Sequence, residues 1–320
     1  MKSLVTGGAG FIGSHLAEAL LLAGHEVRIL DDLSSGREAN LVSVRDAVDL
    51  QVGNVADLEV TKRAVEGRDL VFHLAAIPSV TRSVDDPFGC HRANTLGTLN
   101  VLEASRRARV ARVVYASSSS VYGDSPTLPK HESMREDPLS PYAAQKLLGE
   151  HYCGIYARLH GLSTVALRFF NVFGPRQDPA SPYSGVISIF ARRLLEGEPP
   201  EVHGTGEQSR DFVYVGNVVD ALTRAALRDL PAGMTINVAS GRRITVNELV
   251  TRLRKLTGGP APIHGAPRPG DVSHSLADIS RARELLGYTA AVDLDQGLER
   301  TLAWLRKAVP QQRKESGRHG

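Results

Sequence analysis

The sequence predicts an α/β protein, with a doubly wound parallel sheet and a smaller mixed α/β domain that caps it. Over the first half of the chain, short β-branched runs alternate with longer stretches of helical periodicity, which is the order of βαβ units. A glycine-rich run also follows the first strand directly. Glycines at a strand-to-helix turn are typical of dinucleotide binding, so the sheet is expected to be of Rossmann type.

The strands are predicted from apolar runs that are too short for helices. We expect them at residues 2–6, 26–30, 49–52, 70–75, 112–117 and 164–169. Apolar residues at helical spacing predict helices at 13–24, 94–109 and 142–160. Because parallel strands need crossovers, these helices should cover both faces of the sheet. Residues 1–172 are therefore expected to form one domain.

After residue 172 the pattern changes, because prolines interrupt the chain at short intervals. Helical patterns recur at 186–196, 218–227, 246–256, 280–286 and 294–307. We expect residues 173–310 to form the cap. A segment near 212–240, with the strand-like residues 235–239, is expected to return to the first sheet. The polar residues 311–320 are expected to be a frayed tail.

Composition excludes several classes of function. The chain has 320 residues, with 38 Lys and Arg against 35 Asp and Glu, a net charge of +3. Its basic residues lie at helical spacing among apolar ones, which does not indicate a nucleic-acid surface. No window approaches the ~20 apolar residues of a membrane span. The two cysteines, Cys90 and Cys153, form no disulfide framework, which favours a reducing, cytoplasmic location.

The glycine-rich run predicts a binding site for NAD. Strand 2–6 leads into Gly7, Gly10 and Gly13, where the backbone must turn tightly and approach a pyrophosphate. The following helix start offers unpaired N–H groups to phosphate oxygens. The next strand ends in Asp31 and Asp32. Carboxylates there accept hydrogen bonds from ribose hydroxyls and repel a 2′-phosphate, which favours NAD over NADP.

A catalytic group is predicted from three polar residues. Strand 112–117 leads into Ser118, and a helix with Pro141 in its first turn carries Tyr142 and Lys146. The four-residue spacing places the phenol and the ammonium on one helix face. A phenol with a pKa of about 10 is a poor base at neutral pH. We expect the nearby ammonium and a positive nicotinamide ring to lower the pKa of Tyr142, and the Ser118 hydroxyl to bind the same substrate oxygen.

These residues resemble those of the extended short-chain dehydrogenases/reductases, and specifically the UDP-glucose/UDP-N-acetylglucosamine 4-epimerase type of nucleotide-sugar epimerase. The resemblance runs from about Lys2 to about Trp304 and includes a series of motifs in order. These motifs are Thr6-Gly7-Gly8-Ala9-Gly10-Phe11-Ile12-Gly13-Ser14, His73-Leu74-Ala75-Ala76, Asn94 with Gly97-Thr98, Arg168-Phe169-Phe170-Asn171, Ser209-Arg210-Asp211-Phe212 and Arg268-Pro269-Gly270-Asp271.

The resemblance implies roles for individual residues. Tyr142 would be the base, Lys146 its partner and a ligand of the nicotinamide ribose, and Ser118 the hydroxyl that assists both. It adds cofactor contacts from Phe11, Ile12, Asn54, Val55, Leu74, Ala75, Ala76 and Asn94. It places the UDP-sugar against Ser118, Ser119, Asn171, Val186, Arg210, Arg268, Asp271 and Ser275. Asn54 stands where many relatives have Asp, and an amide can still accept from the adenine amino group. No metal site is implied.

The resemblance also implies a reaction, with tightly bound NAD taking hydride from carbon 4 of the sugar and returning it to the other face. Related 4,6-dehydratases carry Asp-Glu where this chain has Ser119-Ser120, which favours an epimerase. The small Ser275 stands where hexose-only enzymes have Tyr, so we expect UDP-GlcNAc/UDP-GalNAc, with UDP-glucose/UDP-galactose as further substrates.

Three alternatives stay open. A UDP-glucuronate epimerase would need Arg176 or Arg192 to meet the carboxylate. The other two are a net NAD-dependent oxidoreductase and a non-catalytic NAD-binding subunit. Relatives commonly form homodimers, here through helices 94–109 and 142–160, and we expect no nucleic-acid or membrane partner.

Overall fold

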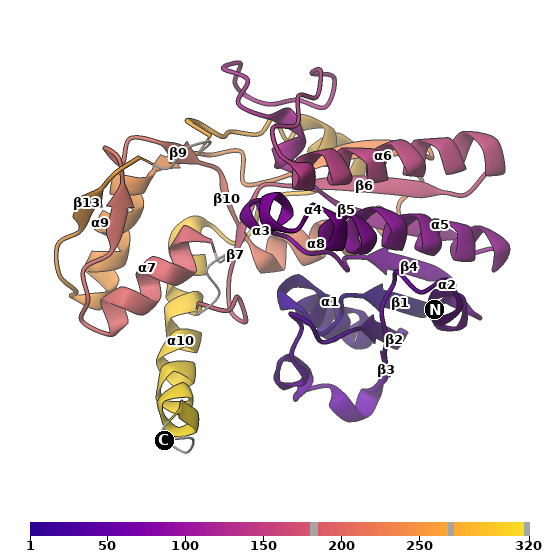
Figure 1. The fold of residues 1–320 in the computed structure, drawn as a ribbon, viewed down its shortest axis with the longest axis horizontal. Helices are drawn as coiled ribbons and strands as arrows, with labels where there is room; N and C mark the ends of the chain where they lie inside the picture. Colours follow the sequence, from indigo (N-terminus) through magenta and orange to yellow (C-terminus); the bar gives the residue numbers. More distant parts are fainter. Residues whose placement is uncertain (180–184, 268–271, 317–320) are drawn as a thin grey trace.

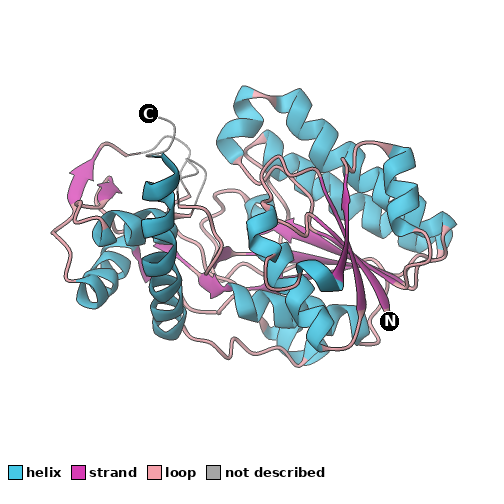
Figure 2. Cartoon of the chain, turned by 90° about the horizontal axis from the view of Figure 1, so that it is seen from below, coloured by secondary structure: helices cyan, strands magenta, loops and turns pink. Residues whose placement is uncertain are grey.

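The computed structural model describes residues 1–179, 185–267 and 272–316. Figure 1 shows two parts, a larger one built around a sheet and a smaller one with α7, α9 and α10. In Figure 2, seen from below, the twisted sheet lies between two layers of helices. The predicted Rossmann-type fold is confirmed.

The sheet has seven parallel strands in the order β11-β6-β5-β4-β1-β2-β3. Their bounds are β1 Lys2–Thr6, β2 Glu26–Asp31, β3 Val48–Val52, β4 Leu70–His73, β5 Arg112–Ser118, β6 Thr164–Phe169 and β11 Met234–Val238. The central strands β4 and β6 are buried along their whole length, as expected for a parallel sheet covered on both faces.

The helices divide between the two faces. α1 (Phe11–Leu22) and α8 (Val215–Leu227) share one core cluster on the first face. α2 (Leu58–Val65), α5 (Gly97–Arg107) and α6 (Pro141–His160) share a second cluster on the other. α6 begins at Pro141 because the Ser140 side chain caps it by accepting a hydrogen bond from the backbone N–H of Ala143, and it ends at Gly161 in the left-handed conformation.

Short elements connect the layers. Between β4 and α5 lie α3 (Val80–Asp85), α4 (Pro87–His91) and a π-helical turn, Arg92–Leu96. The single helix predicted for 94–109 therefore begins with a wider turn, a feature common at functional sites. Three 3-10 turns complete this part, at Glu38–Leu41, Arg45–Ala47 and Ser119–Tyr122.

The smaller part is built from α7 (Val186–Leu195), α9 (Val246–Thr257) and α10 (Leu294–Ser316) around its own apolar core. Three short two-stranded sheets connect this part to the sheet domain or border it. They are β7 (Asn171–Phe173) with β10 (Phe212–Tyr214), β9 (Ser209–Arg210) with β12 (Ile244–Thr245), and β8 (Glu201–His203) with β13 (Ile263–Gly265).

The chain returns to the sheet domain twice. β11 pairs with β6 at the sheet edge, within the segment expected to return. A second return was not predicted: a π-helical turn, Ala282–Leu286, packs in the sheet domain's core together with Ile279 and Tyr288. Burial of these apolar side chains against α8 and β11 explains it. α10 also continues past the predicted end at 307, into the predicted tail.

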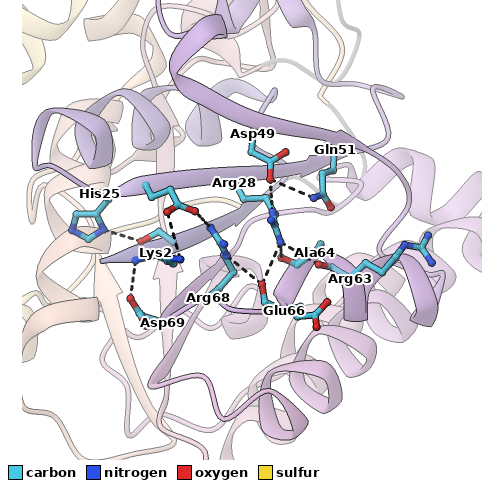
Figure 3. Close-up of polar contacts among 12 residues, drawn as sticks. Lys2, His25, Arg28, Asp49, Gln51, Arg63, Ala64, Glu66, Arg68 and Asp69 are labelled. Atoms are coloured by element: carbon cyan, nitrogen blue, oxygen red, sulfur yellow. Dashed lines mark hydrogen bonds and ion pairs between the residues drawn. The ribbon is translucent and has the colours of Figure 1, made fainter.

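A polar cluster lies at the end of the sheet where the strands begin (Figure 3). The Arg28 guanidinium donates to Asp49 (2.6 Å) and to the carbonyl oxygens of Arg63 and Ala64 (3.1 Å each) at the end of α2. A cation there satisfies the last carbonyls of the helix. This network attaches the end of α2 to β2 and β3, at the end of the sheet that lies away from the glycine turn.

Candidate active site

The predicted site residues come together because parallel strands end at one edge of the sheet. Gly7 follows β1, Asp31 ends β2, Leu74 follows β4 and Ser118 ends β5. The N-terminal turns of α1 and α6 lie at the same edge. Sequence positions far apart are thereby placed around one region.

The glycine turn is packed too closely against the neighbouring backbone to accept side chains. Gly7 has a φ of 69°, and a Cβ there would lie 2.8 Å from the backbone nitrogen of Ala75. A Cβ on Gly13 would lie 2.2 Å from the carbonyl oxygen of Gly7. No side chain caps the start of α1 at Gly10, so N–H groups of its first turn are available to an anion. The turn therefore fits the pyrophosphate of NAD.

The acidic pair after β2 does more than the sequence suggested. The buried Asp31 accepts hydrogen bonds from the backbone N–H groups of Ala9 and Leu33, both at 2.9 Å, so it also shapes the glycine turn. Burial raises the pKa of Asp31 above its usual value, and the two backbone hydrogen bonds oppose this. Asp32 is exposed and accepts from Asn54 Nδ2 at 2.9 Å, which places Asn54 beside the acidic pair.

The other predicted cofactor contacts line the same turn. Ala75 donates its backbone N–H to Thr6 Oγ1 (3.2 Å), and Leu74 and Ala76 flank it. Val55 is buried, and a Cβ on Gly97 would lie 2.6 Å from its side chain. Phe11 and Ile12 begin α1 and also contact the core of the smaller part.

The three predicted catalytic residues lie together at the end of β5 and the start of α6. The Ser118 side chain lies close enough to Tyr142 to lower the pKa of its phenol, and Lys146 Nζ lies 5.9 Å from the Tyr142 ring centroid. Lys146 Nζ donates to the Ala116 carbonyl oxygen at 2.9 Å. One strand end and one helix face thus present two hydroxyls and an ammonium, as the sequence predicted.

The expected lowering of the Tyr142 pKa by Lys146 is wrong for the protein alone. Burial raises the pKa of Tyr142, and the Ser118 side chain opposes this only in part. Burial also lowers the pKa of Lys146 to about 8, against the attraction of Glu150. The ammonium donates to the Ala116 carbonyl, and in the protein alone it does not outweigh the desolvation of the phenol.

The predicted substrate residues lie on the cap side of this edge. Asn171 begins β7 and donates to the Asp211 carbonyl oxygen at 3.3 Å. Arg210 Nη1 donates to the carbonyl oxygens of Ser209 (3.0 Å) and Ser273 (3.3 Å). The backbone N–H of Ser275 donates to the Ser209 carbonyl oxygen at 2.9 Å, next to this arginine.

The same two segments are joined by the backbone N–H of Ser209, which donates to the Ser273 carbonyl oxygen at 3.1 Å. Val186 begins α7, and Ser119 begins the 3-10 turn after β5. Arg268 and Asp271 lie outside the described residues.

Comparison with known proteins identifies the family. The model of the NAD dependent epimerase/dehydratase family matches residues 3–239. A UDP-glucose 4-epimerase of Mycolicibacterium smegmatis is 42% identical over 311 residues, which cover 96% of this chain and 99% of the relative. The chain belongs to this family. The resemblance to the extended short-chain dehydrogenases/reductases and the use of NAD are thereby confirmed.

Two solved structures of the family have nearly the same fold. One is a UDP-N-acetylglucosamine 4-epimerase from Methanobrevibacter ruminantium in complex with UDP-N-acetylmuramic acid, with a TM-score of 0.92, 38% identity and coverage of 96% of this chain and 98% of that one. The other is a point mutant of a UDP-glucuronic acid 4-epimerase from Bacillus cereus, in complex with a fluorinated UDP-glucuronic acid and NAD. Its TM-score is 0.90 at 30% identity, and the match covers 96% of this chain and 100% of that one.

Some residues that build the site in this family member were not predicted. Gln145 accepts a hydrogen bond from Asn94 Nδ2 at 2.8 Å, while Asn94 Oδ1 accepts from the backbone N–H of Ile77 at 2.7 Å. Ser83 on α3 accepts from the backbone N–H of Tyr142 at 3.0 Å. The position of Gln145, directly before Lys146, was the signal that could have drawn attention to it.

The segment after β7 is clamped onto the sheet domain, which the sequence did not predict. The Pro175 carbonyl oxygen lies 2.9 Å from His15 Nε2, and Arg176 Nη2 donates to Glu18 at 2.5 Å. Asp178 forms an ion pair with Arg37, in the loop after β2. These contacts join the cap side of the site to the cofactor side.

Two absences concern the described residues only. Among residues 1–179, 185–267 and 272–316, no three His, Cys, Asp or Glu side chains form a group suited to hold a metal ion. None of the helices in these ranges has the length and apolar character needed to cross a membrane.

Proposed function

We propose that this chain interconverts UDP-sugars that differ in configuration at carbon 4. The observation that carries the proposal is the Ser118, Tyr142 and Lys146 group at the end of β5, beside a glycine turn that fits a pyrophosphate. This group can move a proton on a sugar hydroxyl while the turn holds the cofactor.

The chain's own residues account for the proton transfer. Tyr142, as phenolate, takes the proton of the sugar 4-hydroxyl, and Ser118 holds the same oxygen by a hydrogen bond. Lys146, as ammonium, stabilises the phenolate. The glycine turn and Asp31 would hold the NAD, which when bound supplies a hydride acceptor and donor at its positively charged nicotinamide ring. After the 4-keto sugar turns over, Tyr142 returns the proton to the epimeric oxygen.

We further propose UDP-GlcNAc and UDP-GalNAc as the preferred pair, with UDP-glucose and UDP-galactose also accepted. Support comes from Ser275, a small residue whose backbone N–H donates to the carbonyl oxygen of Ser209, directly before Arg210. Arg210 is half-buried, and a guanidinium suits a diphosphate. A serine at this place leaves room for the 2-N-acetyl group of the sugar.

The two arginines that a glucuronate enzyme would need are already paired with carboxylates. Arg176 donates to Glu18 at 2.5 Å, and Arg192 Nε lies 3.7 Å from Glu196. A sugar carboxylate would have to share these guanidinium groups with Glu18 or Glu196, although Arg176 Nη1 and Arg192 Nε have no hydrogen-bond partner of their own among the described residues. These contacts favour a neutral sugar over UDP-glucuronate.

Product analysis tests the proposal. The NAD-loaded enzyme is incubated separately with UDP-GlcNAc, UDP-glucose and UDP-glucuronate, and the sugars are resolved by chromatography. We expect the 4-epimer of the first with the highest kcat/KM. A net yield of NADH with a keto sugar as the final product would instead indicate an oxidoreductase.

The substitution Ser275→Tyr tests the role of this side chain. Filling the space should lower kcat/KM for UDP-GlcNAc far more than for UDP-glucose. Ser273→Tyr serves as the matched control, because Ser273 is an exposed serine of the same segment. Equal losses on both substrates with Ser275→Tyr would refute the proposed pocket.

We also propose that NAD remains bound between turnovers, that the protein is a homodimer and that it works in the cytoplasm. Exposed apolar side chains on α3 and α4, beside α6, support a dimer: Val80, Val84 and Phe88 are 49%, 61% and 84% exposed. Light scattering after size exclusion tests this, and Phe88→Glu should yield monomers. A wild-type mass equal to 34.5 kDa would contradict the dimer.

A further inference from the structure

The ammonium of Lys146 lies against an aromatic ring that the reaction does not use. Its Nζ is 5.1 Å from the centroid of Tyr115, nearer than its 5.9 Å to the Tyr142 ring. Tyr115 is 1% exposed and Lys146 is 4% exposed. A desolvated cation within about 6 Å of a ring face is attracted by the ring's quadrupole, more strongly than at an exposed site.

The Tyr115 ring is held in this place by the backbone of α6. A Cβ on Gly149 would lie 2.3 Å from the Tyr115 hydroxyl oxygen and 2.5 Å from Cζ. The ring therefore fits only because position 149 has no side chain. The hydroxyl donates to the carbonyl oxygen of Lys146 at 3.4 Å. The same tyrosine thus contacts both ends of the lysine, its backbone and its ammonium.

A row of polar side chains across the sheet supports the ring. Thr6, His73 and Tyr115 are register partners on β1, β4 and β5. His73 lies 2.7 Å from Thr6 Oγ1, and its ring stacks with that of Tyr115 at 5.7 Å between centroids. Its other ring nitrogen lies 2.9 Å from Thr98 Oγ1. Because Thr6 directly precedes Gly7, the row connects the glycine turn to Lys146.

His73 adds no charge to this row. Burial, with a smaller effect of Lys146, lowers the pKa of His73 to about 3. The other titratable groups that face the ammonium are Tyr115 on β5 and Tyr142 and Glu150 on α6. Burial raises the pKa of Tyr115 far above its usual value, so it stays a neutral phenol. Glu150 is thus the anion among these groups, and the Tyr115 ring is a second source of stabilisation for the cation.

We propose that Tyr115 is a positioning residue for the reaction, whose ring, backed by His73, holds the Lys146 ammonium in place and favours its charged form. This inference rests on the proposed role of Lys146. Without the ring, the buried ammonium would lose one of the contacts that oppose its desolvation. Lys146 would then deprotonate at lower pH, and the phenolate of Tyr142 would lose its partner.

The pH dependence of kcat for the NAD-loaded enzyme tests the proposal, with UDP-GlcNAc or UDP-glucose as substrate. Tyr115→Leu removes the ring, and Tyr115→Phe keeps the ring but removes the hydroxyl. Tyr156→Leu is the matched control, because Tyr156 packs on the same core cluster from α6 and its hydroxyl donates to Glu103, away from the site. Lys146→Met tests the role on which the inference rests.

With Tyr115→Leu we expect the alkaline limb of the kcat profile to move down by about one pH unit, while KM changes little. A shift from about 8 to about 7 would leave roughly a tenth of the molecules with the ammonium at pH 8, where the wild type has about half. Tyr115→Phe and Tyr156→Leu should keep the wild-type limb. An unchanged limb in Tyr115→Leu, or an equal shift in Tyr115→Phe, would overturn the proposal.

A second series keeps the test independent of folding. Phenylalanines with an increasing number of fluorine atoms at position 115 weaken the ring quadrupole with little change in size. We expect the alkaline limb to move down stepwise with fluorine number, and a constant limb contradicts the proposal. If Lys146→Met retains wild-type kcat, the proposed role of Lys146 fails. If only the Tyr115 series fails, the proposed function stands.

Discussion

Replacing Glu150 by Gln removes the negative charge from a buried ion pair that joins the catalytic helix α6 to strand β6. The Glu150 carboxylate accepts hydrogen bonds from Arg168 Nε at 2.9 Å and Nη2 at 2.7 Å, and from the Ser117 hydroxyl. The side chains of Arg168 and Glu150 are 2% and 6% exposed. Glu150→Gln therefore leaves a guanidinium in the core without its best partner.

The size of the effect follows from what remains around Arg168. Removing one partner of a buried pair costs about 3–5 kcal/mol when the other charge is left uncompensated. Here Arg168 Nη2 keeps Glu136 at 2.6 Å, and the guanidinium lies 4.7 Å from the Tyr122 ring centroid. The glutamine oxygen can also accept one of the lost bonds. We therefore expect a loss of about 2–3 kcal/mol in the free energy of unfolding.

Urea unfolding followed by far-UV circular dichroism, at a fixed NAD concentration, measures this loss. Circular dichroism is the appropriate signal because the single tryptophan, Trp304, lies in α10 of the cap. Asp295→Asn is the control, since it breaks the ion pair with Arg252 in which the side chains are 60% and 40% exposed. Such pairs contribute about 0.2–1 kcal/mol.

The double variant Glu150→Leu with Arg168→Met sharpens the test. Replacing both charges by apolar groups should cost less than Glu150→Gln alone, because no buried charge is left unpaired. A loss in Glu150→Gln no greater than that of the Asp295→Asn control would refute the reasoning, since it would mean that the buried pair is worth no more than an exposed one.

Three further predictions concern the site and its surroundings. Tyr142→Phe should lower kcat by about 10²–10⁴-fold with little change in UDP-sugar affinity, as calorimetry can check; wild-type turnover in this variant would exclude Tyr142 as the base. Gly13→Ala should cost about 1–3 kcal/mol in unfolding free energy and release the NAD, because its Cβ would lie 2.2 Å from the Gly7 carbonyl oxygen; the nucleotide retained on the purified protein measures this. Burial raises the pKa of Asp211 to about 6, against hydrogen bonds that favour the carboxylate. The folded state then binds this proton more tightly than the unfolded chain, so stability should fall by about 2–3 kcal/mol as the pH rises from 4 to 6. Plots of unfolding free energy across this range should be flatter for Asp211→Asn, and an equal slope would contradict the assignment.

The sequence predicted the strands and the catalytic group because their signals are local. The strands β1 and β6 have the predicted bounds, since a short apolar run between polar or glycine residues leaves little choice of where the strand begins and ends. Tyr142 and Lys146 could be paired because a four-residue spacing places both on one helix face. The order of strand, glycine turn and serine-ended strand then located them at the same edge of the sheet.

What the sequence did not predict depends on contacts between distant segments. The raised pKa of Tyr142 comes from burial, which no local pattern reports. The ring of Tyr115 meets Lys146 only once β5 and α6 are packed. The clamp between Arg37 and Asp178 joins residues 141 positions apart. The return of Tyr288 to the sheet domain is likewise a consequence of packing, because its hydroxyl donates to the Ala239 carbonyl oxygen at 2.8 Å.

The interleaving of the two parts along the chain has a consequence during synthesis on the ribosome. β6 is buried on both faces. In the folded molecule its outer edge is covered by β11, which is translated only after α7, β8, β9, β10 and α8. A nascent chain that ends near residue 172 thus carries an apolar strand with an open edge, the kind of surface that pairs with other chains. The open edge of β6 is therefore covered only after residues 234–238 have been synthesised, and a gene truncated at the apparent domain boundary should give insoluble protein.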